Sequence, residues 1–534
     1  MSDGLATTFR ILSISGNDAA TRVLLPALDS PHQSIQEGAL VALLGKRNPA
    51  GQSAILKRIP SLSPRWKGII SQHPGRLTGA LRDALLGKDE ILYQNACKAA
   101  VMFRDYDLIP ALLAAIEDVS PSKADMAAKT LLQLVSLFYD EFAHSRQNDV
   151  RQDHQWIRQN ALACLETSAQ RFGKHRRREM IEAFLLLVDH NNATLNQILQ
   201  NPHHVSFLVL VEIMSSSSQE GVIELLLSYL EDPQVPSAVL NVVTNRCDLK
   251  FIRHFLRKIA RGQSDVVRQN LKRIQKIAWL RNIENVVDQL DDAAQQSMVL
   301  IVMETGIARA QIFSVIKYIL LHGKPGGRRE AALSLAAFSG ADANALALRA
   351  LDDPDPQVQA NIISQIRHRG IHGMQSRLVE KLESPHLEVR SAARASLTEF
   401  SFPRYLGTFE ILEDEERRTI GALVKKVDQQ TIPLLQKELK SPVRFRRLRG
   451  LQIARALEIA DQVEEAVIDL LKNEDHVLRR EAAATLAECP SAASRQALEA
   501  ALHDSSLAVR EVVQRSLQEQ ALYQNVRKQN ISDE

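Results

Sequence analysis

The pattern that decides the fold lies in residues 343–397, which read ANALALRALDDPDPQVQANIISQIRHRGIHGMQSRLVEKLESPHLEVRSAARASL. Two amphipathic runs, 343–351 and 357–367, flank a short acidic turn that contains proline, and the same layout returns in 375–382 and 387–397. Proline in the first turn of a helix costs no hydrogen bond, because the N–H it lacks has no partner there. Asp or Ser before it can cap the helix. The stretch therefore predicts two consecutive pairs of α-helices.

The same layout recurs along the chain, with a leucine or isoleucine about every thirty residues, each just before a break and a second amphipathic run. A fixed period in this range indicates a solenoid of stacked units, in which each unit buries its apolar face against its neighbours. A looser signal extends back towards the N-terminus at Leu28, Ile59, Leu86 and Ile116. The repeating positions are Leu230, Ile259, Leu290, Leu321, Leu351, Leu382, Leu412, Leu439, Leu471 and Leu502.

The second run of many units opens with an apolar–basic pair followed by a small residue, as in Ile157-Arg158, Val389-Arg390, Leu478-Arg479 and Val509-Arg510. In this the chain resembles HEAT-like repeat proteins, of the short kind also seen in phycobilisome-lyase-type proteins. The resemblance is close from residue 230 onward and loose before it. It implies an all-α, right-handed α-solenoid of about sixteen HEAT-like helix pairs. It also implies a structural ladder between turn aspartates and second-helix arginines, with the candidates Asp352, Asp353, Arg390, Asp475, Arg479, Asp504 and Arg510.

The organisation we expect is a single solenoid over residues 1–523, followed by a polar C-terminal tail at 524–534. Two stretches break the repeat: a polar insertion at 139–156, and 188–230, where the spacing lengthens. Stacking of repeats does not explain an inserted polar segment, and loops often carry function. We therefore predict a specialised contact for 139–156.

Composition fits a soluble helical protein, with 45% hydrophobic and only 5% aromatic residues. The N-terminus has no cationic start followed by an apolar block, and no apolar stretch is long enough to span a membrane. We expect a cytoplasmic protein without a membrane span. The four scattered cysteines form no CxxC pair and lie in or beside apolar stretches, so we expect small buried residues at Cys97, Cys164, Cys247 and Cys489.

No catalytic constellation stands out, so we expect no enzyme, no cofactor and no metal site. Phosphate loops, GxSxG and HExxH are absent, and the glycines of 323–327 lack phosphate-loop spacing. Two HEAT-like enzyme classes bear on this. Phycobilisome lyases are shorter, and the repeat match carries no catalytic residue across. DNA glycosylases of HEAT-like build use a tryptophan-lined cationic groove, whereas Trp66, Trp156 and Trp279 lie far apart in this sequence.

Positive charge gathers in residues 250–281, which we call the basic segment. It holds ten Lys or Arg and one acid, Asp265, for a local charge of +9; since the whole chain carries +3, the remainder carries −6. Its arginines at 253, 257 and 261 are spaced i, i+4, i+8, and so are Arg268, Lys272 and Lys276. This spacing predicts one cationic face on each of two helices, with the apolar residues of the first helix on its other side.

In HEAT-like proteins the second helix of each pair lines the concave surface. The resemblance therefore implies that Arg268, Lys272, Arg273 and Lys276 face the groove. A second cluster stands about six repeats later, at a similar place in its unit. It consists of Arg444, Arg446, Arg447 and Arg449, which we call the arginine cluster.

These features leave three interpretations open. The first is a non-catalytic scaffold or adaptor that binds a protein partner along the concave face, with the basic segment steering an acidic partner. The second is sequence-independent binding of a nucleic-acid backbone through the patches at 250–281 and 444–449. In the third, the cations merely solvate the surface. The sequence names neither the partner nor the oligomeric state.

Overall fold

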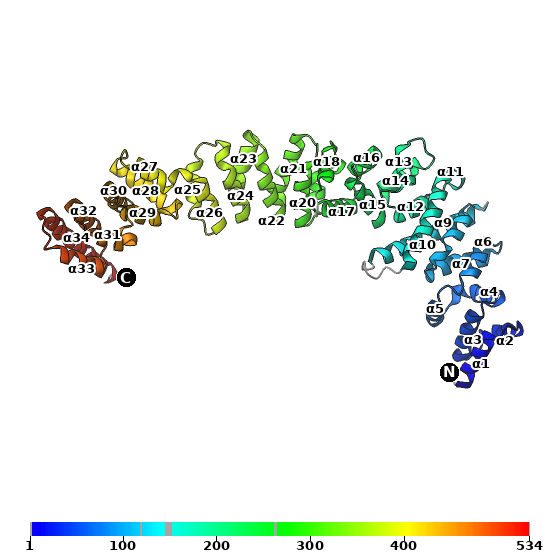
Figure 1. Ribbon diagram of the computed structural model, residues 1–534. Helices are drawn as coiled ribbons and strands as arrows, with labels where there is room; N and C mark the ends of the chain where they lie inside the picture. The colour runs from blue at the N-terminus through cyan, green and yellow to red at the C-terminus, as the bar shows by residue number, and fades with distance from the viewer. Residues whose placement is uncertain (1–2, 118–119, 145–151, 261–263, 533–534) are drawn as a thin grey trace. The chain divides into compact units, whose positions relative to one another are not determined.

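The computed structural model describes residues 3–117, 120–144, 152–260 and 264–532. The described residues form α-helices and short 3-10 turns without strands, so the predicted all-α solenoid class is confirmed. By their internal contacts the residues divide into two compact units, Met1–Val315 and Ile316–Glu534. Each unit is a succession of short helices, shown in chain order in Figure 1.

The helices of the first unit are α1 (Asp3–Ile14), α2 (Ala19–Ala27), α3 (Gln33–Lys46), α4 (Pro49–Lys57), α5 (Pro64–Ser71), α6 (Thr78–Leu86), α7 (Glu90–Met102), α8 (Ile109–Ile116), α9 (Pro121–His144), α10 (Gln152–Gln170), α11 (Phe172–His175), α12 (Arg178–Leu187), α13 (Ala193–Gln200), α14 (Phe207–Ser216), α15 (Glu220–Ser228), α16 (Ser237–Asn245), α17 (Leu249–Ala260), α18 (Asp265–Lys272), α19 (Ile283–Val287) and α20 (Asp292–Glu304).

The boundary between the units falls within α21 (Arg309–His322). The helices of the second unit are α22 (Pro325–Ser334), α23 (Ala341–Ala350), α24 (Pro356–Ile366), α25 (Met374–Lys381), α26 (Leu387–Ser396), α27 (Phe402–Thr408), α28 (Asp414–Val427), α29 (Thr431–Leu439), α30 (Arg444–Ala456), α31 (Glu464–Leu470), α32 (His476–Leu486), α33 (Ala492–Ala501) and α34 (Leu507–Ser532).

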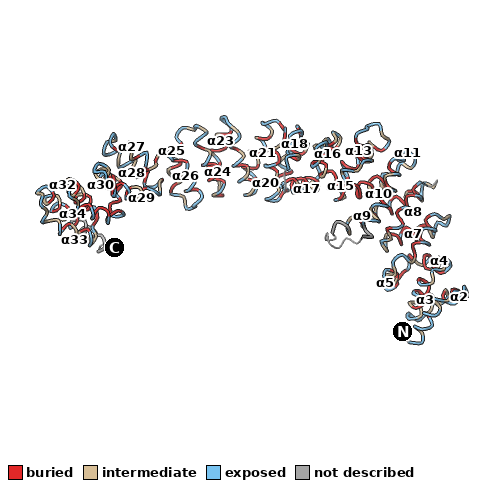
Figure 2. Tube along the Cα trace, viewed as in Figure 1, coloured by how far each residue is buried: buried red, intermediate tan, exposed pale blue. Residues whose placement is uncertain are grey.

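Helices of the same kind pack in rows within each unit. In the first unit, α7, α9, α12, α15, α17 and α20 follow one another, while α4, α6, α8 and α10 form a second row. In the second unit, the second helices of the pairs run from α22 through α24, α26, α28, α30 and α32 to α34. Within each unit, apolar residues are buried between neighbouring helices; the buried positions are red in Figure 2. This neighbour-to-neighbour stacking is what the thirty-residue period predicts.

Most of the repeating positions lie in that core. Leu321, Leu412 and Leu502 are half-buried. The others are buried: Leu230, Ile259, Leu290, Leu351, Leu382, Leu439 and Leu471. The predicted caps are also present in the second unit. Asp355 accepts a hydrogen bond from the Gln357 N–H (2.9 Å), and Asp475 accepts one from the Val477 N–H (2.9 Å). These bonds satisfy donors that the first turn of a helix leaves free.

The two irregular stretches have different structural origins. At 139–156, α9 continues to His144 and α10 begins at Gln152, so most of the polar insertion extends two helices; 145–151 lie outside the described residues. At 188–230, an additional helix, α13, stands between α12 and α14, and this extra element lengthens the spacing. The predicted contact role of the insertion stays a prediction.

The cysteines only partly follow the prediction. Cys97 and Cys489 are buried, and burial raises the pKa of the Cys489 thiol to about 12. Cys164 is half-buried. For Cys247 the prediction is wrong, since its side chain is exposed in the non-helical link between α16 and α17. All four are free thiols.

Candidate functional site

The first helix of the basic segment, α17, has the predicted two-faced character. Its apolar residues are buried against the neighbouring helices: Phe251, Ile252, Phe255, Leu256 and Ile259. Arg253 and Arg257 are exposed on the other side. Arg261, the third member of the predicted stripe, lies outside the described residues.

Most cations of the basic segment have no carboxylate partner. Of its nine described Lys and Arg residues, two form ion pairs: Lys258 with Glu224 (3.1 Å) and Arg268 with Asp265 (3.6 Å). The other seven form no ion pair among the described residues. The hydrogen bonds that some of them donate go to backbone carbonyls or to the side-chain amide oxygen of Asn270. The seven are Lys250, Arg253, Arg257, Lys272, Arg273, Lys276 and Arg281. Most of this positive charge is therefore not compensated by direct ion pairs among the described residues.

Arg253 and Arg257 line a cavity of about 300 Å³ between α17 and α20. Its other walls are small or polar: Ala260, Asp291, Ala293, Ala294 and Ser297. Arg253 donates to the Gln289 carbonyl (2.9 Å), which fixes its guanidinium beside the cavity, and Asp291 is occupied in capping Ala294 (2.8 Å). Guanidinium groups pair with carboxylates through two parallel hydrogen bonds. The cavity thus offers two such groups beside a small apolar floor.

The predicted second stripe is wrong in two respects. Since α18 ends at Lys272, Lys276 lies in the non-helical residues 274–277, and the i, i+8 relation to Arg268 does not hold. In addition, α18 is the first helix of its pair. It packs against α20 and the 3-10 turn Tyr229–Glu231, whereas α15, α17 and α20 form the second-helix row. Arg268, Lys272, Arg273 and Lys276 are all exposed, but not on the row that carries Arg253.

The arginine cluster is bound within the protein. Glu438, whose side chain is only 5% exposed, accepts hydrogen bonds from Arg446 Nε (3.1 Å) and Arg449 (3.1 Å). These bonds, led by the one from Arg446, hold the pKa of the Glu438 carboxyl below its usual range. Arg444 pairs with Asp475 of the next repeat, and the Arg447 Nε is buried without a hydrogen-bond partner. Three of the four cations are therefore already paired, with two carboxylates between them.

Among the residues that the resemblance implied, one rung of the ladder forms, between Arg479 and Asp504 in the second unit. Arg479 donates to Asp504 through Nε (2.7 Å) and a terminal nitrogen (2.9 Å), and also to the Asn473 carbonyl of its own turn (2.8 Å). Arg510 donates to the Asp504 carbonyl of its own turn (2.5 Å), and Arg390 donates to the Ser384 carbonyl of its own turn (2.7 Å). Neither arginine forms an ion pair among the described residues.

Two rungs were not predicted from the sequence: Arg328 pairs with Asp353 (3.0 Å), and Arg329 pairs with Asp355 (2.7 Å). Arg328 also donates to the Gly323 carbonyl of its own turn (3.0 Å). The residue spacing could have predicted the Arg328–Asp353 pair, because Arg328 precedes Asp353 by 25 residues, just as Arg479 precedes Asp504.

The Asp504 rung makes stability depend on pH. The hydrogen bond from Arg479 lowers the pKa of Asp504 in the folded protein. The stabilisation from this rung is therefore fully present above about pH 3.9, the pKa of Asp in an unfolded chain. It is lost as the pH falls through the lower pKa of the folded state. We expect Asp504→Asn to destabilise α32 and α33 by about 1–2 kcal/mol at pH 7. Hydrogen exchange of these helices should show the difference shrinking below pH 4. The exposed Asp469→Asn serves as control, and an equal effect there would contradict the assignment.

The remaining candidate chemistry is limited. Among the described residues, no group of three His, Cys, Asp or Glu side chains is placed to hold a metal ion. Trp279 is buried in the core, and Trp156 on α10 is 61% exposed. Among the described residues, no helix is both long enough and apolar enough to cross a membrane.

No family model and no curated protein matches this chain. Among solved structures, Kap121p aligns over 97% of this chain and 57% of its own length, at 15% identity and a TM-score of 0.27. A structure concerned with the interaction between cadherin and beta-catenin aligns over 93% and 99%, at 13% identity and a TM-score of 0.27. The chain thus spans little more than half of Kap121p, and such values give no indication of function.

The architecture follows from the molecule itself. Paired helices stack in two rows, aspartates cap the second helices, and arginines join successive turns. The described residues thus form an all-α array of stacked helix pairs.

Proposed function

We propose that this protein is a non-catalytic cytoplasmic scaffold that binds an acidic segment of a protein partner through α17 and the adjoining cavity. The observation that carries the proposal is the uncompensated charge of the basic segment, where seven of nine described cations lack a carboxylate partner. An uncompensated positive field attracts acidic partners and accelerates their association.

The position of the cavity supports this assignment. Arg253 and Arg257 lie on the second-helix row, which in HEAT-like proteins lines the concave face. A partner's Asp or Glu side chain fits the cavity between α17 and α20, with its carboxylate on the guanidinium groups and its methylenes on Ala260 and Ala293. The four free cysteines suit a reducing compartment such as the cytoplasm.

The nucleic-acid interpretation receives less support. Gripping a backbone at two places needs two sets of available cations. In the arginine cluster, Arg444, Arg446 and Arg449 are already paired with Asp475 and Glu438. Nucleic-acid binding is therefore an outcome to be tested rather than the function we propose.

The test begins with affinity purification from native cells, with and without nuclease, followed by binding measurements with the identified partner. We expect the partner to survive nuclease. Arg253→Glu/Arg257→Glu should weaken its binding at least about tenfold, equivalent to about 1.4 kcal/mol. The association rate should fall with added salt in the wild type and lose this dependence in the variant.

The control is Arg22→Glu/Lys57→Glu, which makes the same charge change at exposed residues of α2 and α4. It should leave the affinity unchanged. Equal weakening by both variants, or an association rate that ignores salt, would contradict the proposal. Loss of all partners after nuclease would favour the nucleic-acid interpretation.

A further inference from the structure

Within the second-helix row, α17 packs against α15 on one side and against α20 on the other. Towards α15, its basic side chains face acids of the same chain: His254 Nε2 lies 3.5 Å from a Glu220 carboxylate oxygen, and Lys258 pairs with Glu224 (3.1 Å). The two basic residues are four positions apart, and so are the two glutamates. Residues at this spacing lie on one face of a helix, so the two helix faces match over one turn.

Towards α20, the basic side chains of α17 are not paired with acids. Arg253 and Arg257 are also four positions apart, but the residues of α20 that line the cavity with them include Ala293 and Ser297, whose side chains are short and uncharged. Asp291 lines the cavity as well, and it forms no ion pair with either arginine. Two cations one turn apart therefore meet an open cavity here, whereas two basic residues one turn apart meet two glutamates at α15.

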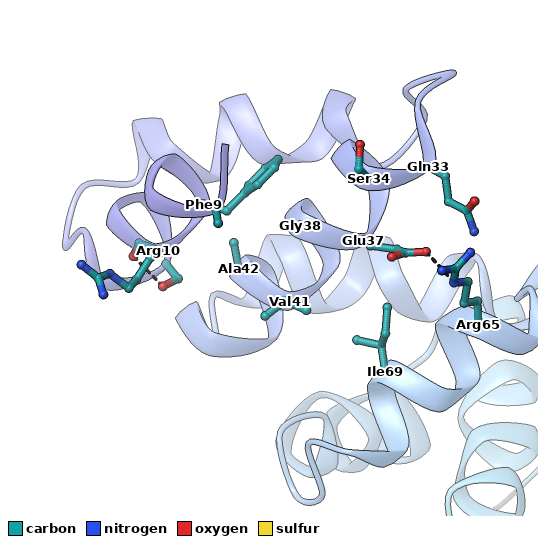
Figure 3. A pocket seen from close by; sticks show the side chains of 12 residues that line it. Phe9, Arg10, Gln33, Ser34, Glu37, Gly38, Val41, Ala42, Arg65 and Ile69 are labelled. Atoms are coloured by element: carbon teal, nitrogen blue, oxygen red, sulfur yellow. Dashed lines mark hydrogen bonds and ion pairs between the residues drawn. The ribbon is translucent and has the colours of Figure 1, made fainter. Parts of the chain in front are cut away.

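A larger groove in the first unit differs in this respect. It has a volume of about 580 Å³ and is lined by side chains of α1, α3 and α5, which are drawn in Figure 3. The acidic side chain in its lining, Glu37, already lies 3.1 Å from Arg65. That carboxylate is therefore paired within the chain, unlike the arginines beside α20.

We propose that the acidic segment bound beside α17 is an α-helix that carries two Asp or Glu residues four positions apart. This inference rests on the proposed function, and it adds the conformation of the ligand and the spacing of its acids. Residues i and i+4 of a helix lie on one face, with about 5–6 Å between their Cβ atoms. Two such carboxylates reach Arg253 and Arg257 together, as the glutamates of α15 reach the basic residues on the other side of α17.

A helical ligand also suits the backbone of this surface. An extended segment that binds through its backbone needs a sheet edge to receive its N–H and C=O groups, and the described residues contain no strand. Backbone groups in the middle of α17 and α20 are already bonded within their own helices. A helix likewise bonds its own backbone, so only its side chains need partners on this surface.

Two alanine- and glutamine-based peptides of about twenty residues test the inference against the full chain. They have the same composition, but one carries glutamates at i and i+4 and the other at i and i+2. Circular dichroism of the free peptides establishes that both are equally helical. Fluorescence anisotropy at low salt should then show at least about tenfold tighter binding of the i, i+4 peptide, because helix residues two apart do not face the same way.

A charge exchange assigns this contact to the two arginines. Arg253→Glu/Arg257→Glu should lose the glutamate peptide, and should bind a peptide with lysines at i and i+4 at least about tenfold more tightly than the unsubstituted protein does. Arg257→Glu alone guards against misfolding, because the exposed Arg257 side chain forms no ion pair or hydrogen bond among the described residues. It should weaken binding of the glutamate peptide several-fold. Arg22→Glu/Lys57→Glu should bind every peptide as the unsubstituted protein does.

The outcomes separate this inference from the proposed function. If both glutamate spacings bind equally, or i, i+2 binds more tightly, and Arg253→Glu/Arg257→Glu weakens both, the helical ligand is wrong while the acid-binding function stands. If the lysine peptide gains nothing in that variant, the pairing with the two arginines is wrong. Binding of neither glutamate peptide, or equal weakening by Arg22→Glu/Lys57→Glu, would overturn the inference and the proposed function together.

Discussion

Replacing Arg246 with alanine is expected to destabilise the region from α14 to α17 by about 3 kcal/mol. The Arg246 side chain is 1% exposed and pairs with Asp248 (2.6 Å). It also donates to the carbonyls of Met214 (2.8 Å) and Ser217 (2.5 Å) at the end of α14. These carbonyls have no partner within the helix. Alanine would leave them buried and unpaired, and would remove the guanidinium that lies 5.0 Å from the Phe251 ring centre.

The loss should be local, because each repeat contacts only its neighbours. Relative to the unsubstituted protein, hydrogen exchange in the Arg246→Ala variant should therefore become faster in α14, α16 and α17, and should stay unchanged in α1 to α4. The matched control is Arg257→Ala, which removes an exposed arginine on the next helix and should change stability by less than about 0.5 kcal/mol. If the two substitutions had equal effects, Arg246 would not be the link between these repeats.

Replacing Glu438 with alanine is expected to destabilise α29 and α30 by about 3 kcal/mol. This carboxylate is nearly buried and accepts hydrogen bonds from Arg446 and Arg449, within a run that contains four arginines. Without it, like charges face each other with nothing to offset them. The lowered pKa of Glu438 sets the direction of the pH effect: its contribution is present above about pH 4.3 and is lost as the pH falls through the folded pKa.

Thermal unfolding and hydrogen exchange at pH 7 would measure this loss. Glu499→Ala, at an exposed position of α33, is the control and should have little effect. This prediction also bears on function. If the arginine cluster were a nucleic-acid site rather than a structural one, Glu438→Ala would free its cations and strengthen nucleic-acid binding without loss of stability.

The repeats could be predicted because their signals are local. An apolar residue every thirty positions, a turn with Asp and Pro, and a following helix all lie within one unit, and the predicted helices at 343–351 and 357–367 appear as Ala341–Ala350 and Pro356–Ile366. The Arg479–Asp504 rung was implied by the resemblance to HEAT-like proteins, and it has the same offset of 25 residues as Arg328 and Asp353.

The available charges could not be identified by counting cations within a segment. Arg446 and Arg449 share a carboxylate on the preceding helix, and Arg444 meets Asp475 in the next repeat, so compensation crosses unit boundaries. For a related reason, the sequence did not show that α18 lies in the row of first helices. Between α12 and α20 the extra helix α13 and the very short α19 disturb the period, so alternation of helices alone does not show that α18 begins a pair.

The arginine–aspartate ladder makes the helix pair a transferable unit in evolution. Arg328 and Arg479 each bind a carbonyl of their own turn and the aspartate of the turn that follows. A pair that carried both an arginine for its successor and an aspartate for its predecessor would therefore close both junctions without a compensating mutation. A pair that lacks either residue interrupts the series. Such a chain can lengthen or shorten by whole units, while a gain or loss of half a unit would leave polar groups unmatched on both sides.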